Sequence, residues 1–375
     1  MTKINPDRLL KDIRRNKFDR RTFMQGVAAA GLSTVLIPTA PKFVRADATI
    51  TYFTWSGYDL PEMFPEYIAK YGTPPNFAIF GEEEEALQKM RGGFTADISH
   101  PCTSNIRRWR DAEVITPIDV SRVERWDEIM PALKRPKGVE IDGQNYFVPW
   151  DWGNTSLLYR ADLVDMTPED ETYAILLDDR YAGKMSVFDS AETVAAIAGL
   201  LTGAKDPFNQ TPEEIAATFE LWKQIHANLR FYWTDTTQFE QALATGEIVV
   251  ASAWNESVGK LQAEGVDVRY MNPKEGILTW VCGLSANLNA DGDDQEVYDM
   301  MNAMLDPEVG KWLIEFYNYG HSNAKSYEIA DPEILASMGL IDPVAMIEST
   351  VFFDEMPTDM RETINAELER VKAGL

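Results

Sequence analysis

Strand and helix patterns alternate regularly along the first part of this chain that resembles folded protein. Residues 48–55 alternate β-branched and aromatic side chains, as strands do, and residues 60–71 carry apolar side chains at helical spacing. The same order continues with a strand at 76–80, a helix at 82–91 and a strand that begins at residue 97. Repeats of this length form parallel α/β sheets, whose ligands bind beyond the carboxyl ends of the strands.

A second run of α/β pattern begins near residue 183. Its expected strands are 183–188, 248–254, 266–271 and 277–284, and its expected helices are 191–201, 211–229, 239–243, 293–305, 307–319 and 360–372. Between the two runs, Pro149 fixes its own φ and keeps Val148 extended, so residues 146–153 should form a stiff strap. The strap is either the end of a buried strand with two core tryptophans or a segment that joins two lobes.

Residues 1–46 have the features of an export signal. Arg20 and Arg21 precede an uncharged stretch at 26–40, which is too short to span a membrane comfortably, and residues 44–46 form a small-x-small cleavage site. The paired arginines resemble a twin-arginine signal of bacterial export. We expect cleavage near Ala46 and a periplasmic protein. An N-terminal membrane anchor is the alternative, but no stop-transfer pattern follows.

The chain is strongly acidic, with a formal net charge of −25. Residues 1–46 hold ten Lys or Arg but only three Asp or Glu, so the remaining chain is more acidic still. Such a surface repels nucleic acid and anionic lipid and attracts cations into a cleft, although solubility or adaptation to salt explains it equally well. The length suffices for two lobes with separate cores. No later segment is apolar enough to span a bilayer.

Motifs for catalysis and for metal or phosphate binding do not occur in the sequence. The three histidines, His100, His226 and His321, lack the spacing of metal ligands, and nucleophile-elbow, Walker and Cys-x-x-Cys motifs are missing. Residues 287–292 begin like a calcium loop, but Tyr298 stands where a bidentate glutamate is needed. A polar turn before a helix is the better interpretation. We therefore predict no catalytic residue, no metal and no cofactor.

Aromatic residues gather at the predicted strand ends and in the strap. They are Trp55, Tyr58, Trp150, Trp152, Trp254 and Trp280. The face of an aromatic ring attracts organic cations, and one or two carboxylates can complete such a site. In an acidic exported protein, this pattern indicates binding of a small organic cation.

Six short motifs occur in a consistent order: Tyr-Phe-x-Trp-Ser-x-Tyr, Asp-Ile-Ser-x-Pro, Val-Pro-x-x-Trp-Gly, Asp-Ser-x-Glu, Trp-Asn-x-Ser and Pro-Lys-Glu-Gly-x-x-x-Trp. From about Thr49 to the C-terminus, they resemble the periplasmic spermidine/putrescine-binding proteins of polyamine ABC importers. The resemblance implies an α/β, two-lobed periplasmic-binding-protein fold (type II-like), with a sheet flanked by helices in each lobe and the ligand cleft between the lobes. It also implies that the loaded protein is recognised by a membrane permease.

The resemblance also suggests where the lobes begin and end. We expect residues 47–153 and 283–325 in lobe 1, and residues 154–282 and 326–375 in lobe 2, with crossings near Gly153 and Cys282. A single continuous sheet running through both halves would overturn this division. We further expect a monomer that binds no nucleic acid.

Position by position, the resemblance implies a ligand-lining role for Trp55, Ser56, Tyr58, Trp254 and Trp280. The last two would stack on the methylene chain of the ligand. Other family positions have changed: a small hydroxyl residue is Cys102 here, and a tyrosine is Ser104. A late ring-bearing position is assigned to His321.

Several of the family's carboxylates are replaced. Its acidic pair at the start of a second-lobe helix falls on Ser190 and Thr193, and the aspartate two residues after the second tryptophan is Cys282. The acids that could take over are Asp151, Glu192 and Glu256. A long diamine needs an anion at each end, because burying an unpaired ammonium costs several kcal/mol.

The identity of the ligand stays open at this point. A polyamine fits if a neighbouring acid has taken over the missing role, whereas another amine, a quaternary ammonium or an amino acid would suit a ring cage with one carboxylate. An exported enzyme is the remote alternative, since histidines are scarce and no nucleophile motif occurs. Cys102 and Cys282 both fall on ligand-lining positions, either as free thiols or as a disulfide.

Overall fold

The computed structural model describes residues 49–338, 340–348 and 350–374, so the predicted signal peptide, 1–46, lies outside the described residues. The strands are β1 (Thr51–Trp55), β2 (Asn76–Phe80), β3 (Ile98–Ser99), β4 (Glu140–Ile141), β5 (Gln144–Asn145), β6 (Val148–Arg160), β7 (Met185–Phe188), β8 (Leu229–Trp233), β9 (Val250–Trp254), β10 (Val268–Tyr270), β11 (Leu278–Ala286), β12 (Gly320–His321) and β13 (Val351–Phe352). The helices are α3 (Pro65–Tyr71), α4 (Glu83–Arg91), α5 (Ile106–Asp111), α6 (Ala191–Thr202), α7 (Pro212–Asn228), α8 (Thr236–Thr245), α9 (Glu256–Ala263), α10 (Asp294–Met304), α11 (Pro307–Tyr317), α12 (Ser326–Ile329), α13 (Pro332–Ser337), α14 (Pro343–Glu348) and α15 (Thr358–Lys372).

The predicted parallel unit at the start of the folded chain is confirmed. β1 pairs in parallel with both β2 and β3, and α3 and α4 connect these strands. The Glu82 carboxylate caps α4 by accepting hydrogen bonds from the backbone N–H groups of Glu84 and Glu85. The carboxyl end of β1 therefore delivers Trp55 and the residues after it to one edge of the sheet.

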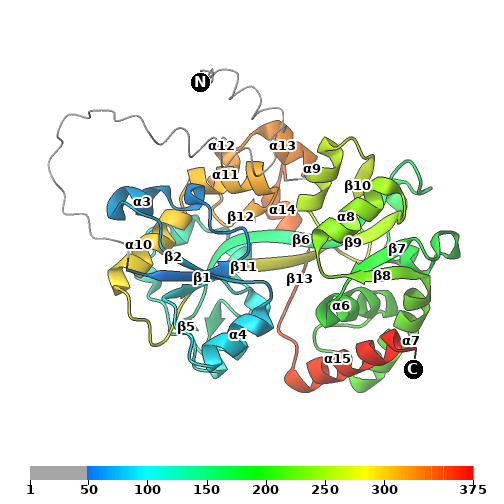
Figure 1. The fold of residues 1–375 in the computed structure, drawn as a ribbon, viewed down its shortest axis with the longest axis horizontal. Coiled ribbons are helices and arrows are strands. Elements are labelled where there is room, and N and C mark those ends of the chain that lie inside the picture. Colours follow the sequence, from blue (N-terminus) through cyan, green and yellow to red (C-terminus); the bar gives the residue numbers. More distant parts are fainter. Residues whose placement is uncertain (1–48, 339, 349, 375) are drawn as a thin grey trace, which may run out of the picture. The chain divides into compact units, whose positions relative to one another are not determined.

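In the second α/β run, helix-capping residues in the sequence mark where the helices begin. β7 pairs in parallel with β8 and β9. Ser190 caps α6, and α7 begins with Pro212 and a reciprocal capping box between Thr211 and Glu214. α6, α7 and α15 lie together on this half (Figure 1).

Two long strands connect the halves. β6 and β11 pair antiparallel along most of their length and run between the two halves in Figure 1. The strand order is β2-β1-β3-β11-β6-β9-β7-β8, so hydrogen bonding is continuous. This continuous sheet is the outcome named above as overturning the expected lobe division, which assumed a separate sheet in each lobe. The reason is that the crossing segments are themselves strands, and each half adds its own strands to them.

The hydrophobic cores are nevertheless separate. One cluster is drawn from residues 50–152 and 281–347, and the other two from residues 157–278 and 353–371. Ala330, Leu335 and Ile347 belong to the first cluster, although we had expected residues 326–375 in lobe 2. On these contacts we propose that lobe 1 extends to about residue 350 and that the segment 350–357 forms a third crossing.

Candidate functional site

A pocket of about 220 Å³ opens where the strand ends of the two halves meet. Its walls come from segments that are far apart in the sequence: the end of β1, the loop after β3, the crossing strands β6 and β11, the end of β9, the start of α9, and the end of α11 with the residues after it. The lining residues are Trp55, Ser56, Tyr58, Cys102, Asp151, Trp254, Glu256, Trp280, Cys282, Tyr317 and Tyr319.

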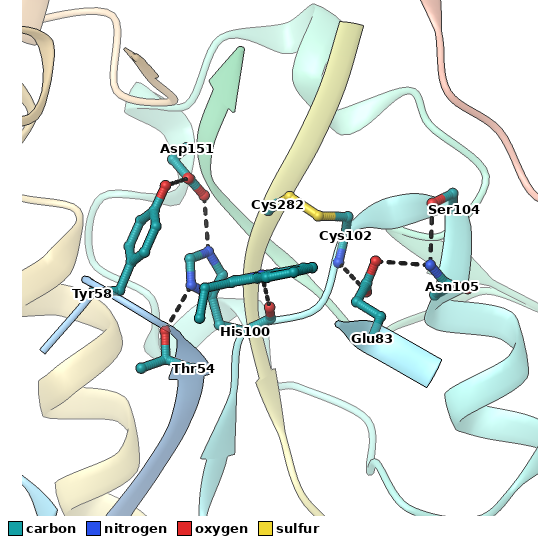
Figure 2. Close-up of a disulfide and its surroundings, with 10 residues drawn as sticks. Thr54, Tyr58, Glu83, His100, Cys102, Ser104, Asn105, Asp151 and Cys282 are labelled. Atoms are coloured by element: carbon teal, nitrogen blue, oxygen red, sulfur yellow. Dashed lines mark hydrogen bonds and ion pairs between the residues drawn. A yellow bond between two sulfur atoms is a disulfide. The ribbon is translucent and has the colours of Figure 1, made fainter. Parts of the chain in front are cut away.

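One of the two carboxylates of the pocket, Asp151, is held in place by hydrogen bonds to two neighbouring side chains. The Tyr58 hydroxyl donates to its Oδ2 at 2.9 Å, and Nε2 of His100 lies 3.0 Å from its Oδ1 (Figure 2). Asp151 is only 1 % exposed, and both of its oxygens already have one partner. Each carboxylate oxygen can accept a further hydrogen bond, so Asp151 can still receive a donor from the pocket.

The second carboxylate, Glu256, is the first residue of α9 and is partly buried. Burial raises the pKa of Glu256, and a hydrogen bond from the Tyr319 hydroxyl opposes part of this rise. Raising the pKa of a carboxyl means that its surroundings disfavour the charged form. A cation bound beside Glu256 would remove that penalty by pairing with the carboxylate.

Aromatic rings make up most of the remaining wall. Tyr58, Tyr317 and Tyr319 follow one another in two stacked contacts, with ring centroids 5.5 and 6.1 Å apart. The ring of Trp280 meets the edge of Tyr319 at 4.9 Å. Gly153 supports this wall from behind, because a Cβ at that position would overlap the Trp280 ring. The pocket therefore offers ring faces and two carboxylates, and its lining contains no lysine or arginine.

Cys102 and Cys282 form a disulfide that lines the pocket (Figure 2), so of the two alternatives left open by the sequence, the structure has the bridge. Cys282 faces Asp151 across the β6–β11 ladder and Cys102 on its other side. The backbone N–H of Cys102 donates to Glu83 at 2.8 Å, and burial raises the pKa of that carboxyl to about 8. Glu83 itself does not line the pocket.

Comparison with known proteins assigns the chain to a family. Residues 81–337, more than half of the chain, match the model of the bacterial extracellular solute-binding proteins. The chain belongs to this family. The sequence of this solute-binding protein is 24 % identical to the putrescine-binding periplasmic protein PotF of Escherichia coli (strain K12) over 340 residues, which cover 86 % of this chain and 90 % of that protein.

A further relative and a solved structure agree with this family and its fold. The spermidine/putrescine-binding periplasmic protein of Escherichia coli (strain K12) is 24 % identical over 325 residues, covering 85 % of this chain and 88 % of its own. The crystal structure of the spermidine/putrescine ABC transporter substrate-binding protein PotD from Streptococcus pneumoniae superposes with a TM-score of 0.75 at 18 % identity, covering 87 % of this chain and 99 % of that one. The two-lobed periplasmic-binding-protein fold predicted from the sequence is therefore confirmed.

Nine of the residues predicted for the site of this solute-binding protein line the pocket together: Trp55, Ser56, Tyr58, Cys102, Asp151, Trp254, Glu256, Trp280 and Cys282. Four others lie elsewhere. Ser190 caps the Thr193 backbone N–H at the start of α6, and Thr193 is buried there. Glu192 forms an ion pair with Arg361, and Ser104 is buried beside Asn105. None of these four side chains lines the pocket.

His321, the fifth exception, was placed in the site by its resemblance to a ring-bearing family position. It is fully buried, with Nε2 3.0 Å from the Met304 carbonyl oxygen and Nδ1 3.1 Å from the Ser326 hydroxyl. Burial lowers the pKa of His321 to about 4, so the ring is neutral. Tyr319, two residues earlier, lines the pocket instead.

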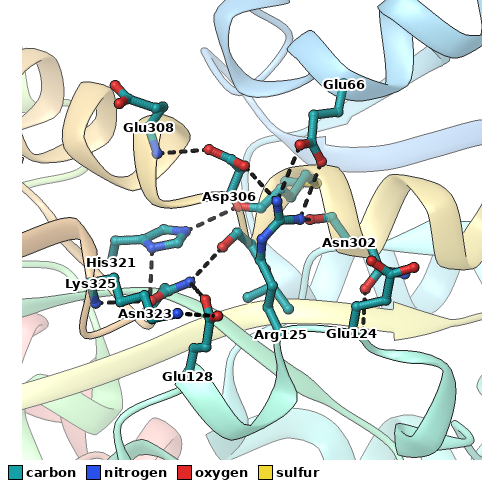
Figure 3. A network of polar contacts seen from close by, with 12 residues as sticks. Glu66, Glu124, Arg125, Glu128, Asn302, Asp306, Glu308, His321, Asn323 and Lys325 are labelled. Atoms are coloured by element: carbon teal, nitrogen blue, oxygen red, sulfur yellow. Dashed lines mark hydrogen bonds and ion pairs between the residues drawn. The ribbon is translucent and has the colours of Figure 1, made fainter.

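The surroundings of His321 form a structural network (Figure 3). Arg125 pairs with Glu66 and Asp306, and Glu128 meets Asn323 and Lys325. This network fastens the chain after α11 to lobe 1, and none of the residues named in it lines the pocket.

The two tryptophans of the strap are also structural. Trp150 and Trp152 are at most 1 % exposed, and their indole N–H groups donate to the Met304 carbonyl and to the Tyr327 hydroxyl. Both are core tryptophans, and the strand β6 that carries them also connects the two halves, so the two interpretations of this segment hold together. Within the described residues, no group of three or more His, Cys, Asp or Glu side chains is arranged to hold a metal ion, and no helix combines the length and apolarity needed to cross a membrane.

Proposed function

We propose that this solute-binding protein captures a small organic amine, in the first place a polyamine of putrescine size, in the periplasm and delivers it to the permease of an ABC importer. The observation that carries the proposal is the pocket lining. It combines six aromatic rings with the carboxylates of Asp151 and Glu256 and contains no cationic side chain. Ring faces and carboxylates both stabilise an ammonium group, whereas an anionic ligand would find no cationic side chain in the lining.

The size of the pocket favours a short ligand. Its volume of about 220 Å³ is below the range of about 300–1,000 Å³ that is usual for pockets of drug-sized ligands. Curated relatives along most of the chain are named for putrescine and spermidine. Putrescine, the shorter of these, is therefore the first candidate.

A ligand with a single cationic group is the second candidate, and one observation favours it. The position at which the resemblance implies a carboxylate holds Cys282, and the disulfide has no charge to offer an ammonium group. A quaternary ammonium or a monoamine needs only one carboxylate. With either ligand, we propose that the protein is a monomer, that its signal peptide is cleaved and that it catalyses no reaction.

Isothermal titration calorimetry and thermal shift with a panel of ligands test the proposal. The panel contains putrescine, spermidine, spermine, a monoamine, betaine, arginine and, as an anionic control, succinate. We expect the short amines to bind and to raise the melting temperature, because a ligand that binds only the folded state stabilises it. Asp151→Asn should abolish binding, whereas Asp59→Asn, an exposed acid of the neighbouring loop, should not. Binding of succinate alone would refute the proposal.

A further inference from the structure

Asn255 stands between two pocket-lining residues without lining the pocket itself. Its neighbours Trp254 and Glu256 line the pocket at the start of α9 and form what we call the α9 wall. The side-chain amide of Asn255 has two partners: Oδ1 accepts from the backbone N–H of Asn154 on β6 at 3.0 Å, and Nδ2 donates to the carbonyl oxygen of Asn318. One side chain thus contacts both the crossing strand and the end of α11.

Asn318 has the corresponding position on the other side of this contact. It ends α11, where a positive φ of 57° turns the chain, and its neighbours Tyr317 and Tyr319 line the pocket as the α11 wall. The Tyr319 hydroxyl also donates a hydrogen bond to Glu256. Of these two hydrogen bonds between the walls, the one from Asn255 lies outside the pocket lining.

Asn255 does not cap its own helix. An asparagine just before a helix ordinarily accepts a hydrogen bond from a backbone N–H group of the first turn. Asn255 precedes the first residue of α9, and its side chain forms no capping hydrogen bond within the described residues of this helix. Its amide instead binds partners that are 101 and 63 residues away in the sequence. Long-range contacts therefore orient this side chain.

Two glycines allow the close approach that the contact requires. A Cβ at Gly153 of β6 would lie 2.8 Å from Oδ1 of Asn255, and a Cβ at Gly259 of α9 would lie 2.9 Å from Nδ2 of Asn318. Both distances are shorter than non-bonded Cβ contacts in proteins. Glycine inside a helix is otherwise unfavourable relative to alanine. The packing of Asn318 against α9 accounts for a glycine at position 259.

We infer that Asn255 is a positioning residue for ligand binding: its amide fixes the spacing between the α9 wall and the α11 wall, and this spacing selects the size of the cationic head group that fits between them. Walls that are held by protein contacts do not have to be ordered by the ligand, so loss of the contact weakens binding. A looser spacing also admits a bulkier head group. The inference rests on the proposed function, because it requires that a cationic ligand binds in this pocket.

The deciding variant is Asn255→Asp, for which charge and positioning predict opposite results. The carboxylate keeps an acceptor for the N–H of Asn154, but it cannot donate to the carbonyl oxygen of Asn318. Its negative charge next to Glu256 would by itself strengthen the binding of a cation. We expect instead that putrescine binds at least about threefold more weakly near neutral pH, as for the loss of one hydrogen bond.

A second variant and a matched control complete the set. Asn255→Ala removes both hydrogen bonds without adding charge and should weaken putrescine binding by about threefold to tenfold. Gln262→Glu adds the same charge as Asn255→Asp at an exposed position of α9 that does not line the pocket, so putrescine affinity should stay nearly unchanged.

Calorimetry with two ligands distinguishes positioning from mere support of the fold. The ligands are putrescine and its N,N,N-trimethyl derivative, which differ in the size of one head group. Both Asn255 variants should lose less affinity for the trimethyl derivative than for putrescine, because the looser walls admit the bulkier group. Unchanged or tighter putrescine binding in Asn255→Asp, or equal losses for the two ligands, would overturn the inference.

Hydrogen exchange without ligand separates this inference from the proposed function. Asn255→Ala should speed up exchange of the backbone amides at 314–321, on the far side of the contact, relative to the wild type and to Gln262→Glu. If no amine binds to the wild type while this change is seen, the proposed function fails but the contact between the walls stands. If exchange at 314–321 does not change, the inference fails whatever ligand binds.

Discussion

Trp254 and Trp280 occupy an unusual position among the aromatic residues of the pocket. Both are partly exposed, and each packs against the core of lobe 1 and a core of lobe 2 at the same time. Trp254 also contacts Phe188 and Trp233, with ring centroids 5.4 Å away in each case. The exposed part of each side chain is therefore available to a ligand, while the buried part packs against the cores of both halves.

Truncating either tryptophan should show whether its side chain contacts the ligand or only supports the fold. We expect Trp254→Ala and Trp280→Ala to weaken amine binding by about 1–3 kcal/mol, through lost cation–π contact and lost apolar burial. Trp126→Ala is the matched control, since Trp126 is also partly buried on the lobe 1 core but does not line the pocket. Titration calorimetry and melting temperatures of all three variants decide. If the pocket variants lose stability but keep wild-type affinity, the two rings are core residues only.

Not every residue of the pocket could be recognised from the sequence. Tyr319 was missed because apolar spacing predicted a helix through residue 319, whereas α11 ends at Tyr317 and Asn318 turns the chain with a positive φ of 57°. His100 and Asp151 are 51 residues apart, and no periodicity shows that β3 and β6 bring them together. Trp150 and Trp152 lie on a strand buried on both faces, where alternation no longer separates core from surface.

At the scale of elements, β11 is the part of the fold on which the pocket depends most. It carries Trp280 and Cys282, pairs with β6 along the crossing, and shifts its register between Cys282 and Gly283. The disulfide to Cys102 ties the strand to lobe 1 at this irregularity. The residues that cap α6 and α7 could be recognised in the sequence. The register shift of β11 could not, because a β-bulge depends on pairing with the neighbouring strand.

Two matched double variants should separate the structural and the electrostatic effect of the disulfide. Cys102→Ser/Cys282→Ser should lower the free energy of unfolding by about 2–5 kcal/mol, as expected for a bridge that closes a long loop. Cys102→Ser/Cys282→Asp should lose similar stability but bind putrescine or spermidine more tightly, because it restores an anion for the ammonium group. Chemical denaturation and calorimetry measure both quantities. Equal polyamine affinities in the two variants would show that Asp151 and Glu256 already supply all the charge that the ligand needs.

At the scale of the whole molecule, the halves also meet away from the pocket. Arg107 of α5 pairs with Glu355 at 2.8 Å, and Lys137 of lobe 1 pairs with Asp354. Both acids lie on the proposed third crossing, between β13 and α15. The two α/β halves were predictable from local periodicity. The return of the chain was expected near residue 326, and we propose that it lies near residue 350, because residues 326–348 lack a sequence pattern that distinguishes the two cores.

These ion pairs make a last prediction about closure. If amine binding favours a closed arrangement, contacts that hold the third crossing against lobe 1 contribute to affinity without touching the ligand. Each pair is partly exposed and is therefore worth at most about 1 kcal/mol. Arg107→Gln/Lys137→Gln removes two such pairs and should thus weaken binding by about thirtyfold or less at low salt. The difference from wild type should shrink at high salt, where such pairs are screened.

The matched control removes two ion pairs within lobe 2, Lys223 with Glu220 and Arg230 with Glu247. Lys223→Gln/Arg230→Gln changes the net charge by the same amount, so it reproduces any general electrostatic effect on a cationic ligand. Calorimetry at two salt concentrations compares the two double variants. A larger loss of affinity in Arg107→Gln/Lys137→Gln than in the control assigns the third crossing to the closing motion, and equal losses would limit closure to the strands β6 and β11.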